Sequence, residues 1–372
     1  NVTNSTIDNV KLVLKSSNSD EIVIDTDYEI NDSTLEFTTG EIINEGLDLE
    51  SLGRKSYYLL LKVAYTNGQD KYYSLENKTN YSNIDYYTIT KNSENNKIYI
   101  NFGEYNSVPY LNLAANKVEK LPDDVYDIVI DPGHGGIDAG AVNGNYYEAD
   151  IVLDCAQKLK TKLEELGLKV FLTRDGTEDE NENTAYNMYD DNGRITKAME
   201  ANAKIFTSLH MNSNQAYLAN GGVEVYTPGK FNYDFAQLLA DNIVKMANTN
   251  YSLMTTNRVK NGVYMDNFTQ NDIEQANEEA IAGGYEPYEN ITTDTSYLFM
   301  LRETGGIATG AYVDGRNTNY SANKYYNSNI GLESYLIELG YMSVQEDLDN
   351  ILNNSDAYMQ AVAESIKTQY LN

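Results

Sequence analysis

The chain has 372 residues, which is long enough for two domains with separate hydrophobic cores. Hydrophobic residues make up 41% of it and charged residues 22%, which favours a folded chain over a disordered one. The formal net charge of −29 excludes a nucleic-acid partner, because phosphate binding requires clustered lysine and arginine side chains. No apolar run approaches the roughly 18–20 residues of a membrane-spanning helix, so no membrane span is expected.

Residues 1–118 are expected to form a small all-β domain. The chain opens with NVTNSTIDN and shows no signal peptide, as expected of a trimmed, mature protein. Segments rich in Val, Ile, Leu and Tyr, several of which alternate with polar residues, predict half-buried strands and favour a β-sandwich. These strands are expected at Val10–Lys15, Glu21–Ile24, Ser56–Tyr65, Asp85–Thr90 and Lys97–Phe102, with a hairpin turn at Ser93–Asn96.

The polar segment Ala114–Asp124 predicts a linker, of which residues 119–124 separate the two domains. From residue 125 to 372, apolar runs alternate with amphipathic helices, which predicts an α/β domain with a largely parallel sheet. Cys155, the single cysteine, falls on the apolar face of the first helix and is expected to be a small buried core residue. The strands of this domain are expected at Asp127–Ile130, Lys169–Thr173, Lys204–Leu209, Val223–Tyr226 and Ser334–Leu339, and its helices at Ala149–Leu166, Gly193–Ala201, Tyr233–Ala247 and Asp356–Tyr370.

Two long segments interrupt this alternation. Thr173–Gly193 is acidic and is expected to be a long loop. Asn261–Leu301 lies within an insertion at about residues 261–331, contains neither Lys nor Arg, and is expected to hold a short helix around Ile273–Ile281. Long insertions in compact domains are usually disordered or functional, so a lid is one interpretation of this insertion.

Both histidines of the chain follow directly on predicted strands, His134 in IVIDPGHGG and His210 in KIFTSLHMNS. Ligands of open α/β sheets bind outside the carboxyl ends of the strands, so both imidazoles are expected at one edge. Glu338, in the otherwise apolar run SYLIELGYMS, predicts a paired, metal-bound or functional carboxylate, because an isolated buried charge is costly. Glu148 precedes the first long helix and can face the same edge.

Two histidines and two glutamates at one edge predict a zinc site. Catalytic zinc takes three protein ligands and keeps one position open. Two imidazoles and one carboxylate would supply the ligands, and the second carboxylate would act as a general base. A histidine at the end of a strand can equally be a capping or core residue, so the spacing alone leaves the metal site open.

The same residues resemble the zinc-dependent N-acetylmuramoyl-L-alanine amidases, often called amidase 3, from Tyr126 to the C-terminus. IVIDPGHGGIDAGAV is similar to the opening strand and first-ligand loop of the family, with His134 as that ligand. Glu148, in YYEADIVLDC, and His210, in GRITKAMEANAKIFTSLHMNS, fall where the family carries its second and third ligands. IELGYMS resembles the strand that bears the catalytic glutamate, here Glu338.

The resemblance implies a peptidoglycan hydrolase with one Zn²⁺ bound by His134, Glu148 and His210. It would hydrolyse the amide bond between N-acetylmuramic acid and the L-alanine of the stem peptide, with Glu338 transferring the proton. Two further residues would bind substrate: Asn212, and Arg302 in the segment LFMLRET. The family fold is a mixed, mostly parallel sheet flanked by helices. The activity further implies a secreted, cell-wall-associated bacterial autolysin.

Two parts of the chain depart from the family pattern. The insertion at residues 261–331 could be a lid on which a regulatory protein acts, part of a groove for the glycan, or a surface elaboration. The N-terminal β-domain could bind cell wall or serve as a spacer. Other functions also fit much of the pattern: a zinc peptidase that cuts within the stem peptide would use the same ligands, and a wall-binding module could have lost its activity.

Overall fold

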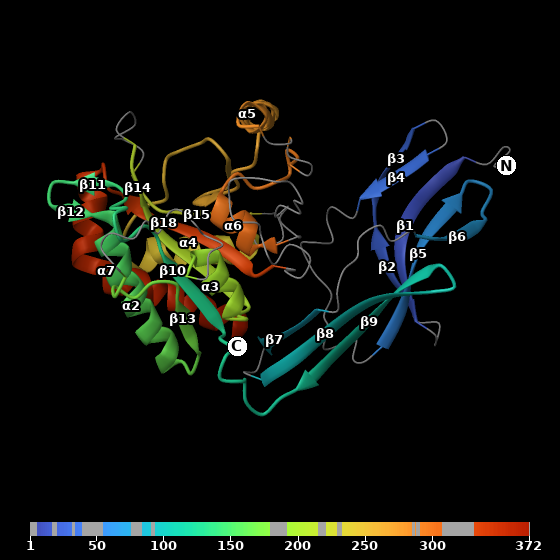
Figure 1. The fold of residues 1–372 in the computed structure, drawn as a ribbon, viewed down its shortest axis with the longest axis horizontal. Helices are drawn as coiled ribbons and strands as arrows, with labels where there is room; N and C mark the ends of the chain where they lie inside the picture. The colour runs from blue at the N-terminus through green and yellow to red at the C-terminus, as the bar shows by residue number, and fades with distance from the viewer. Residues whose placement is uncertain are drawn as a thin grey trace. The chain divides into compact units, whose positions relative to one another are not determined.

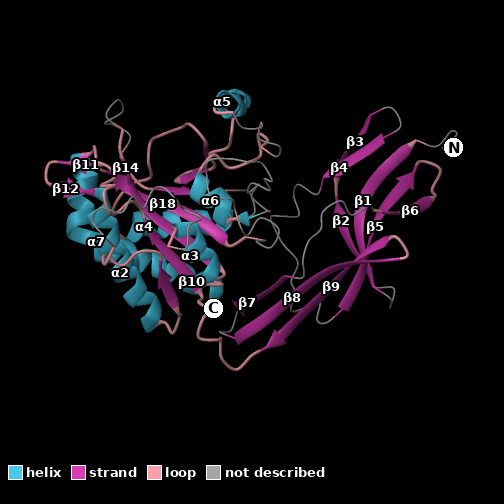
Figure 2. Ribbon diagram, viewed as in Figure 1, coloured by secondary structure: helices cyan, strands magenta, loops and turns pink. Residues whose placement is uncertain are grey.

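A computed structural model describes residues 6–16, 21–31, 34–38, 55–75, 84–90, 94–178, 192–214, 221–228, 233–284, 287, 291–306 and 331–371 (Figure 1). The chain divides into two compact units. The first contains residues 1–86 and 96–117, and the second contains residues 87–95 and 118–372. All described elements of the first are strands, whereas the second combines a sheet with helices (Figure 2).

The N-terminal unit is built on one large sheet. Its strands run in the order β2-β1-β5-β9-β8-β7, with β6 paired to β5, and β3 and β4 form a separate hairpin. The predicted all-β fold is therefore confirmed, although one sheet and a hairpin replace the expected sandwich. The strands are β1 (Ile7–Ser16), β2 (Glu21–Asp25), β3 (Asp27–Asn31), β4 (Thr34–Thr38), β5 (Lys55–Tyr65), β6 (Asp70–Ser74), β7 (Ile84–Thr90), β8 (Glu94–Tyr105) and β9 (Val108–Lys117).

One face of this sheet carries the two clusters of buried apolar side chains. Alternate residues of the strands are buried there, because successive side chains of a strand point to opposite faces. One cluster contains Leu14, Ile24, Tyr57, Leu111 and Leu113. A second, further along the same strands, contains Val10, Leu61, Val63 and Tyr65, and the β3–β4 hairpin packs against it through Tyr28, Leu35 and Phe37.

The linker begins later than predicted. β9 runs to Lys117, and Ala114 and Ala115 pair with Tyr99 and Ile98 of β8. Backbone pairing with β8 therefore keeps these residues in a strand although their side chains are small or polar. Glu94 and Asn96 of the hairpin turn expected at Ser93–Asn96 lie in β8 instead, and Ser93 lies outside the described residues.

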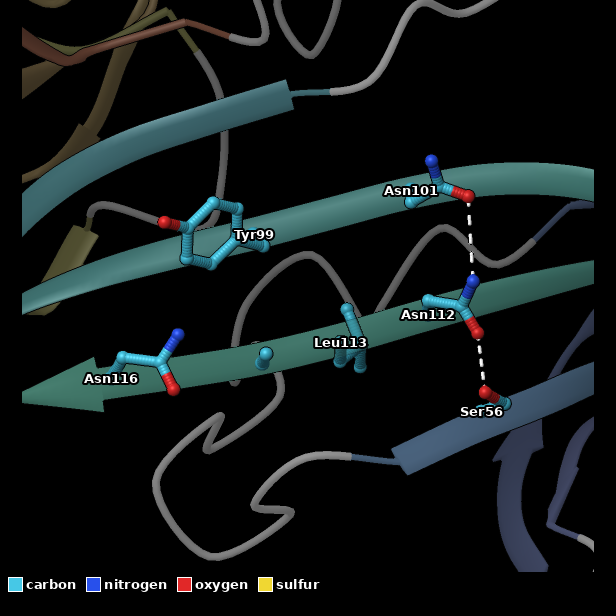
Figure 3. A pocket seen from close by; sticks show the side chains of 7 residues that line it. Ser56, Tyr99, Asn101, Asn112, Leu113 and Asn116 are labelled. Atoms are coloured by element: carbon cyan, nitrogen blue, oxygen red, sulfur yellow. Dashed lines mark hydrogen bonds between the residues drawn. The ribbon is translucent and has the colours of Figure 1, made fainter.

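A pocket of about 710 Å³ lies against β9 in this unit (Figure 3). The Ser56 hydroxyl donates a hydrogen bond to Asn112 Oδ1, and Asn112 Nδ2 donates one to Asn101 Oδ1 at 3.4 Å. These bonds link three neighbouring strands through their side chains. The described residues that line the pocket are Ser56, Tyr99, Asn101, Asn112, Leu113, Ala114 and Asn116.

The second unit contains a mixed sheet in the order β13-β10-β14-β18-β15-β17-β16. The neighbours β13, β10, β14 and β18 are parallel, whereas β15 is antiparallel to β18 and β16 is antiparallel to β17. The predicted mixed, mostly parallel sheet is therefore confirmed. Its strands are β10 (Ile128–Pro132), β13 (Val170–Leu172), β14 (Ile205–Asn212), β15 (Glu224–Tyr226), β16 (Arg258–Lys260), β17 (Val263–Tyr264) and β18 (Glu333–Tyr341); β11 (Val142–Asn143) and β12 (Tyr146–Tyr147) form a small hairpin beside it.

Helices cover both faces of this sheet (Figure 2). On one face α2, α4 and α7 pack around buried residues that include Ile130, Leu209 and Ile337. On the other face lie α3 and α6, beside Phe206 and Leu336. The helices are α2 (Glu148–Glu165), α3 (Arg194–Glu200), α4 (Tyr233–Met246), α5 (Gln270–Ala282), α6 (Phe299–Thr304) and α7 (Gln345–Tyr370).

The first long helix, α2, confirms the prediction at its expected place. Its apolar residues recur at helical spacing, and Ile151, Val152, Cys155 and Leu159 are all buried against the sheet. Burial raises the pKa of the Cys155 thiol to about 12. The thiol is therefore protonated near neutral pH, and Cys155 is a core residue as predicted.

The C-terminal helix is longer than predicted. α7 begins at Gln345 rather than at Asp356, and its first piece buries Leu348 and Ile351. Asn354 has a non-helical backbone (φ −129°, ψ 16°) and separates this piece from the predicted one. The polar residues around this kink break the helical spacing of apolar residues, which explains why the sequence predicted only the second piece.

The insertion extends the sheet and adds an exposed helix. β16 and β17, which were not predicted, lie at or just before its start. α5 confirms the short helix expected around Ile273–Ile281, and Thr269 and Asp272 form a reciprocal cap at its first turn. Residues 307–330, and residues 179–191 of the expected Thr173–Gly193 loop, lie outside the described residues. No helix in the described part of the chain is long and apolar enough to cross a bilayer.

Candidate metal centre

The loop after β10 holds His134 in a constrained conformation. His134 has a φ of 59°, in the left-handed region that residues other than glycine rarely adopt. Arg174 donates hydrogen bonds to the carbonyls of Pro132 and Gly133, both at 2.9 Å. Arg194 donates to the carbonyls of Pro132 and His134. Two buried guanidinium groups thus hold the loop, which lets it retain a strained backbone.

Asp131, near the end of β10, anchors Arg194. Its carboxylate accepts hydrogen bonds from Thr173 at 2.5 Å, Arg194 at 2.7 Å and Ser208 at 2.8 Å. Burial alone would raise the pKa of Asp131, but the charge of Arg194 and these hydrogen bonds outweigh burial and lower it. The Asp131 carboxylate therefore joins Thr173 to Ser208 of β14 by hydrogen bonds, and its ion pair with Arg194 connects them to the His134 loop.

The three predicted ligands meet at the edge of the sheet where the predicted strands end. His134, Glu148 and His210 each place one ligand atom within 4.8 Å of the others. Glu148 Oε1 lies 3.1 Å from His134 Nε2 and 3.1 Å from His210 Nδ1. The two imidazole rings are close to perpendicular, with an interplanar angle of 81° and a centroid distance of 4.9 Å. The three side chains therefore converge on one point from three different elements.

Glu148 is the buried member of this group, with 3% of its surface exposed. Its Oε1 atom accepts a hydrogen bond from the Met211 backbone N–H, and Oε2 accepts one from Ala141, both at 2.9 Å. Burial alone would raise the pKa of Glu148, but the hydrogen bonds with His134 and His210 lower it far below its usual range. The carboxylate is therefore ionised, as a metal ligand must be.

Asp138 orients His134 from the other side of the ring. Its Oδ2 atom lies 2.9 Å from His134 Nδ1, which leaves Nε2 facing Glu148. Burial alone would lower the pKa of His134, but Glu148 and Asp138 outweigh burial and raise it. A carboxylate behind the non-ligating nitrogen is the usual device that fixes the orientation of a ligating histidine. Asp138 was not predicted, although it follows His134 by four residues.

Gly140 lets the loop pass directly over the ligands. It has a φ of 65°, and a Cβ atom there would lie 2.6 Å from His134 Cδ2 and 2.7 Å from Glu148 Oε2. No side chain fits at that distance. The space beside the two ligands therefore depends on glycine at this position.

Glu338 lies beside His210 across the β14–β18 pair, with the two residues in register. Residues that pair in register project from the same face of a sheet. Glu338 Oε2 is buried and has no hydrogen-bond partner within the described ranges. Burial, together with the charges of Glu148 and Glu224, raises the pKa of Glu338 well above its usual range. This carboxyl group thus combines high proton affinity with an oxygen that no described residue uses.

Asn212 and Arg302, the predicted substrate-binding residues, lie in different surroundings. Asn212 is two residues beyond His210, and its Nδ2 atom donates a hydrogen bond to Glu224 at 2.9 Å. Arg302 is buried on α6, where it donates to the Ser296 carbonyl at 2.8 Å and lies over the Phe268 and Phe299 rings. These contacts hold the Arg302 side chain inside the protein, and its predicted role in substrate binding stays a prediction.

Glu224 is a buried carboxylate that the sequence analysis missed. It is 0% exposed, lies on β15, and pairs in register with Glu338. The signal that drew attention to Glu338, a charged residue inside an apolar strand, is also present in the run GGVEVYT. The same argument applied to Val223–Tyr226 would have found it.

The donor set fits zinc. Two imidazole nitrogens and one carboxylate oxygen are ligands of catalytic zinc sites, whereas Ca²⁺ and Mg²⁺ prefer oxygen ligands alone. Glu338 pairs in register with His210, and its Oε2 atom has no hydrogen-bond partner among the described residues. The described residues thus bring together three side chains that could hold a metal ion, with a separate carboxyl group beside them.

Residues 128–284 match the family described as N-acetylmuramoyl-L-alanine amidase, Amidase 3. This part of the chain therefore resembles the amidase 3 family. The matched residues include His134, Glu148 and His210 and end before Glu338. The family resemblance predicted from the sequence is therefore confirmed.

Two relatives of the amidase domain come from Bacillus subtilis (strain 168). N-acetylmuramoyl-L-alanine amidase LytC is 32% identical over 126 residues, which cover 34% of this chain and 24% of LytC. A germination-specific N-acetylmuramoyl-L-alanine amidase is 29% identical over 156 residues, which cover 38% of this chain and 62% of that protein. The chain thus spans less than two thirds of either relative.

Solved structures similar to this chain carry the same description. An N-acetylmuramoyl-L-alanine amidase from Clostridium difficile 630 aligns with 66% of this chain and 97% of its own, at 20% identity and a TM-score of 0.41. N-acetylmuramoyl-L-alanine amidase AmiC2 of Nostoc punctiforme aligns with 65% of this chain and 96% of its own, at 22% identity and a TM-score of 0.39.

Proposed function

We propose that this chain is a zinc-dependent hydrolase of peptidoglycan that cleaves the amide bond between N-acetylmuramic acid and the L-alanine of the stem peptide. The observation that carries the proposal is the convergence of His134, Glu148 and His210, with Glu338 in register beside His210. The match of residues 128–284 to the amidase 3 family supports the choice of bond.

His134, Glu148 and His210 would hold the Zn²⁺ ion. When bound, the ion supplies Lewis acidity toward the scissile carbonyl. Glu338 would take the proton of the attacking water on a carboxylate oxygen and deliver it to the leaving L-alanine nitrogen. The buried Oε2 atom of Glu338 supports this role, because no described residue forms a hydrogen bond with it.

The remaining parts of the proposal concern location and partners. Peptidoglycan lies outside the cytoplasmic membrane, so the proposed substrate requires a secreted enzyme associated with the bacterial cell wall. The N-terminal unit would hold the enzyme on the wall or act as a spacer. The insertion at residues 261–331 would form a lid on which a regulatory protein acts; α5 supports this, because none of its residues is buried.

Product analysis tests the proposed function. The full chain, loaded with zinc, is incubated with purified cell walls, and the soluble products are separated and sequenced. Hydrolysis of the proposed bond releases stem peptides with a free L-alanine amino group and leaves intact glycan strands. Cleavage between amino acids of the stem would instead support a peptidase, and an absence of products from a zinc-loaded chain would contradict the proposal.

A further inference from the structure

The β14–β18 pair contains a bulge immediately beyond the proposed site. His210 pairs with Glu338, but the next recorded pair joins Asn212 to Tyr341. From the first pair to the second, β14 advances by two positions and β18 by three, so β18 has one extra residue here. A bulge of this kind changes the direction of the strand and the face to which the following side chains point.

The extra residue decides which face Tyr341 occupies. Side chains alternate along a regular strand, so Tyr341, three residues after Glu338, would point to the opposite face without the bulge. Gly340 absorbs the irregularity, with a φ of 150° and with the Asp347 side chain packed against it. The Tyr341 backbone N–H donates to Asp347 Oδ2 at 2.9 Å. Tyr341 therefore lies on the same face as Glu338 and Asn212.

Glu224 connects the two strand ends on that face. Its Oε1 atom accepts a hydrogen bond from the Tyr341 hydroxyl at 2.5 Å, and its Oε2 atom accepts one from Asn212 Nδ2 at 2.9 Å. The Tyr226 hydroxyl donates to the same Oε2 atom at 2.9 Å. The buried Glu224 carboxylate thus binds both Asn212, which follows His210 on β14, and Tyr341, which follows Glu338 on β18.

We propose that Glu224 is a positioning residue for Glu338: by holding Asn212 and Tyr341 together it fixes the bulge, and with it the direction of the Glu338 carboxyl group relative to His210. The assignment rests on the proposed function of Glu338. Glu224 is a suitable clamp because a carboxylate offers only acceptors to three donors, and charge-assisted hydrogen bonds are shorter and stronger than neutral ones. Buried bonds of this kind also resist competition from water.

The clamp is tested with Glu224→Gln and Tyr341→Phe, alone and combined. Gln has nearly the size of Glu but presents an NH₂ group to one of the three donors, and Phe removes only the hydroxyl that binds Oε1. Tyr358→Phe is the matched control, because Tyr358 is a buried tyrosine of α7 whose hydroxyl bonds to Asn350. Each protein is loaded with zinc, its zinc content is measured, and its kcat and KM are determined on a soluble muramoyl-peptide.

We expect each variant to bind zinc at wild-type stoichiometry and to lose about 10- to 100-fold in kcat with little change in KM, because a displacement of about 1 Å costs up to 10²-fold. The double variant should lose no more than the stronger single variant, since both changes break one clamp. Tyr358→Phe should keep wild-type kcat. A kcat within twofold of wild type in folded, zinc-loaded Glu224→Gln, or losses that multiply in the double variant, would overturn the assignment.

Hydrogen exchange supplies a second measurement that does not depend on hydrolysis. Peptides that cover Glu333–Met342 should exchange at least several-fold faster in Glu224→Gln and Tyr341→Phe than in wild type and Tyr358→Phe, with or without zinc. Unchanged exchange would refute the clamp. If the wild type fails to cleave the muramoyl-peptide, the proposed function fails by itself, and the exchange rates still decide whether Glu224 fixes the bulge. If Glu224→Gln does not fold, Tyr341→Phe carries both measurements.

Discussion

His134 is held in place through its backbone, its carbonyl and its ring. Its backbone is in the left-handed region, its carbonyl accepts a bond from Arg194, and its Nδ1 atom faces Asp138. The ring therefore has little freedom to turn away from Glu148. Pre-organisation of this kind lowers the entropic cost of binding a metal, because the ligands are already ordered before the ion arrives.

Substitutions at His134 and Asp138 should weaken zinc binding to different degrees. His134→Ala removes a ligand and should leave less than a tenth of the zinc bound by the wild type after dialysis. Asp138→Asn removes only the carboxylate behind the ring and should weaken zinc binding by about 10- to 100-fold. Competition with a chromogenic chelator measures both. Equal zinc affinity in Asp138→Asn and wild type would show that Asp138 does not orient the ligand.

Glu338→Gln should separate metal binding from catalysis. The amide cannot accept a proton from water, so kcat should fall by about 10²- to 10⁴-fold. Zinc content should stay at the wild-type value, because Glu338 is not among the three proposed ligands. Metal analysis and a hydrolysis assay on the same preparation check both parts. A large loss of zinc would instead make Glu338 a ligand.

Asp127 should make the stability of the second unit depend on pH. Burial raises the pKa of Asp127 from 3.8 to about 6, against the opposing effect of a hydrogen bond from the Lys169 N–H at 2.6 Å. The folded state therefore binds this proton more tightly than the unfolded state, so stability is highest below pH 4 and falls as the pH rises to about 6. Above that pH the cost is constant.

Asp127→Asn should remove this cost and keep a hydrogen-bond acceptor. We expect the variant to gain about 1–2 kcal/mol in the free energy of unfolding at pH 7 and to match the wild type at pH 4. Denaturant unfolding at the two pH values measures the difference. An equal gain at both would show that the effect does not come from ionisation.

Strands and helices with clear apolar spacing could be predicted from the sequence, and those that depend on distant pairing could not. β10, β14 and β18 contain short apolar runs, and α2 has regular apolar spacing, so their positions could be predicted from the sequence pattern. These elements carry His134, Glu148, His210 and Glu338. The candidate site was therefore predictable because its residues interrupt, begin or follow strongly patterned elements.

Other elements have no signal of their own. β16 and β17 are two or three residues long, and they become strands only by pairing beside β15. Asp138 contacts His134, which lies four residues before it in the chain. Glu224 contacts the site from a separate strand, β15. The bulge at Gly340 depends on the register between β14 and β18, and a single sequence does not contain that register.

The loop that carries Gly140 tolerates no side chain beside the ligands. Gly140→Ala would place a Cβ atom against His134 and Glu148 and strain a left-handed backbone. Gly144→Ala is the matched control, because Gly144 has a similar φ of 60° but nothing within 4 Å of its Cβ position. Both should lose about 1–3 kcal/mol of stability from the backbone. Only Gly140→Ala should lose zinc affinity, by at least 10-fold, and equal affinity in both would contradict this geometry.

At the scale of the whole molecule, the three proposed ligands and Glu338 are confined to one of two compact units. His134, Glu148, His210 and Glu338 all belong to the unit of residues 87–95 and 118–372. The family match also falls entirely within residues 128–284. Metal binding should therefore stabilise this unit and leave the N-terminal sheet unaffected, because a ligand stabilises only the folded state that binds it.

Calorimetry with and without a chelator tests this separation. Removing zinc should lower the melting temperature of the transition that belongs to the second unit, with a loss of about 4 kcal/mol if free zinc had been present at 1,000 times its Kd. The transition of the N-terminal unit should not move. In His134→Ala the chelator should have no effect on either transition. A shift of both transitions in the wild type would contradict the confinement of the metal to one unit.

Anomalous diffraction at the zinc absorption edge tests the central claim most directly. We predict one strong peak in crystals of the zinc-loaded chain, about 2.0–2.2 Å from a ligand atom of each of His134, Glu148 and His210, with an open position facing Glu338. A peak that lies elsewhere, or the absence of any peak among these side chains, would contradict the account.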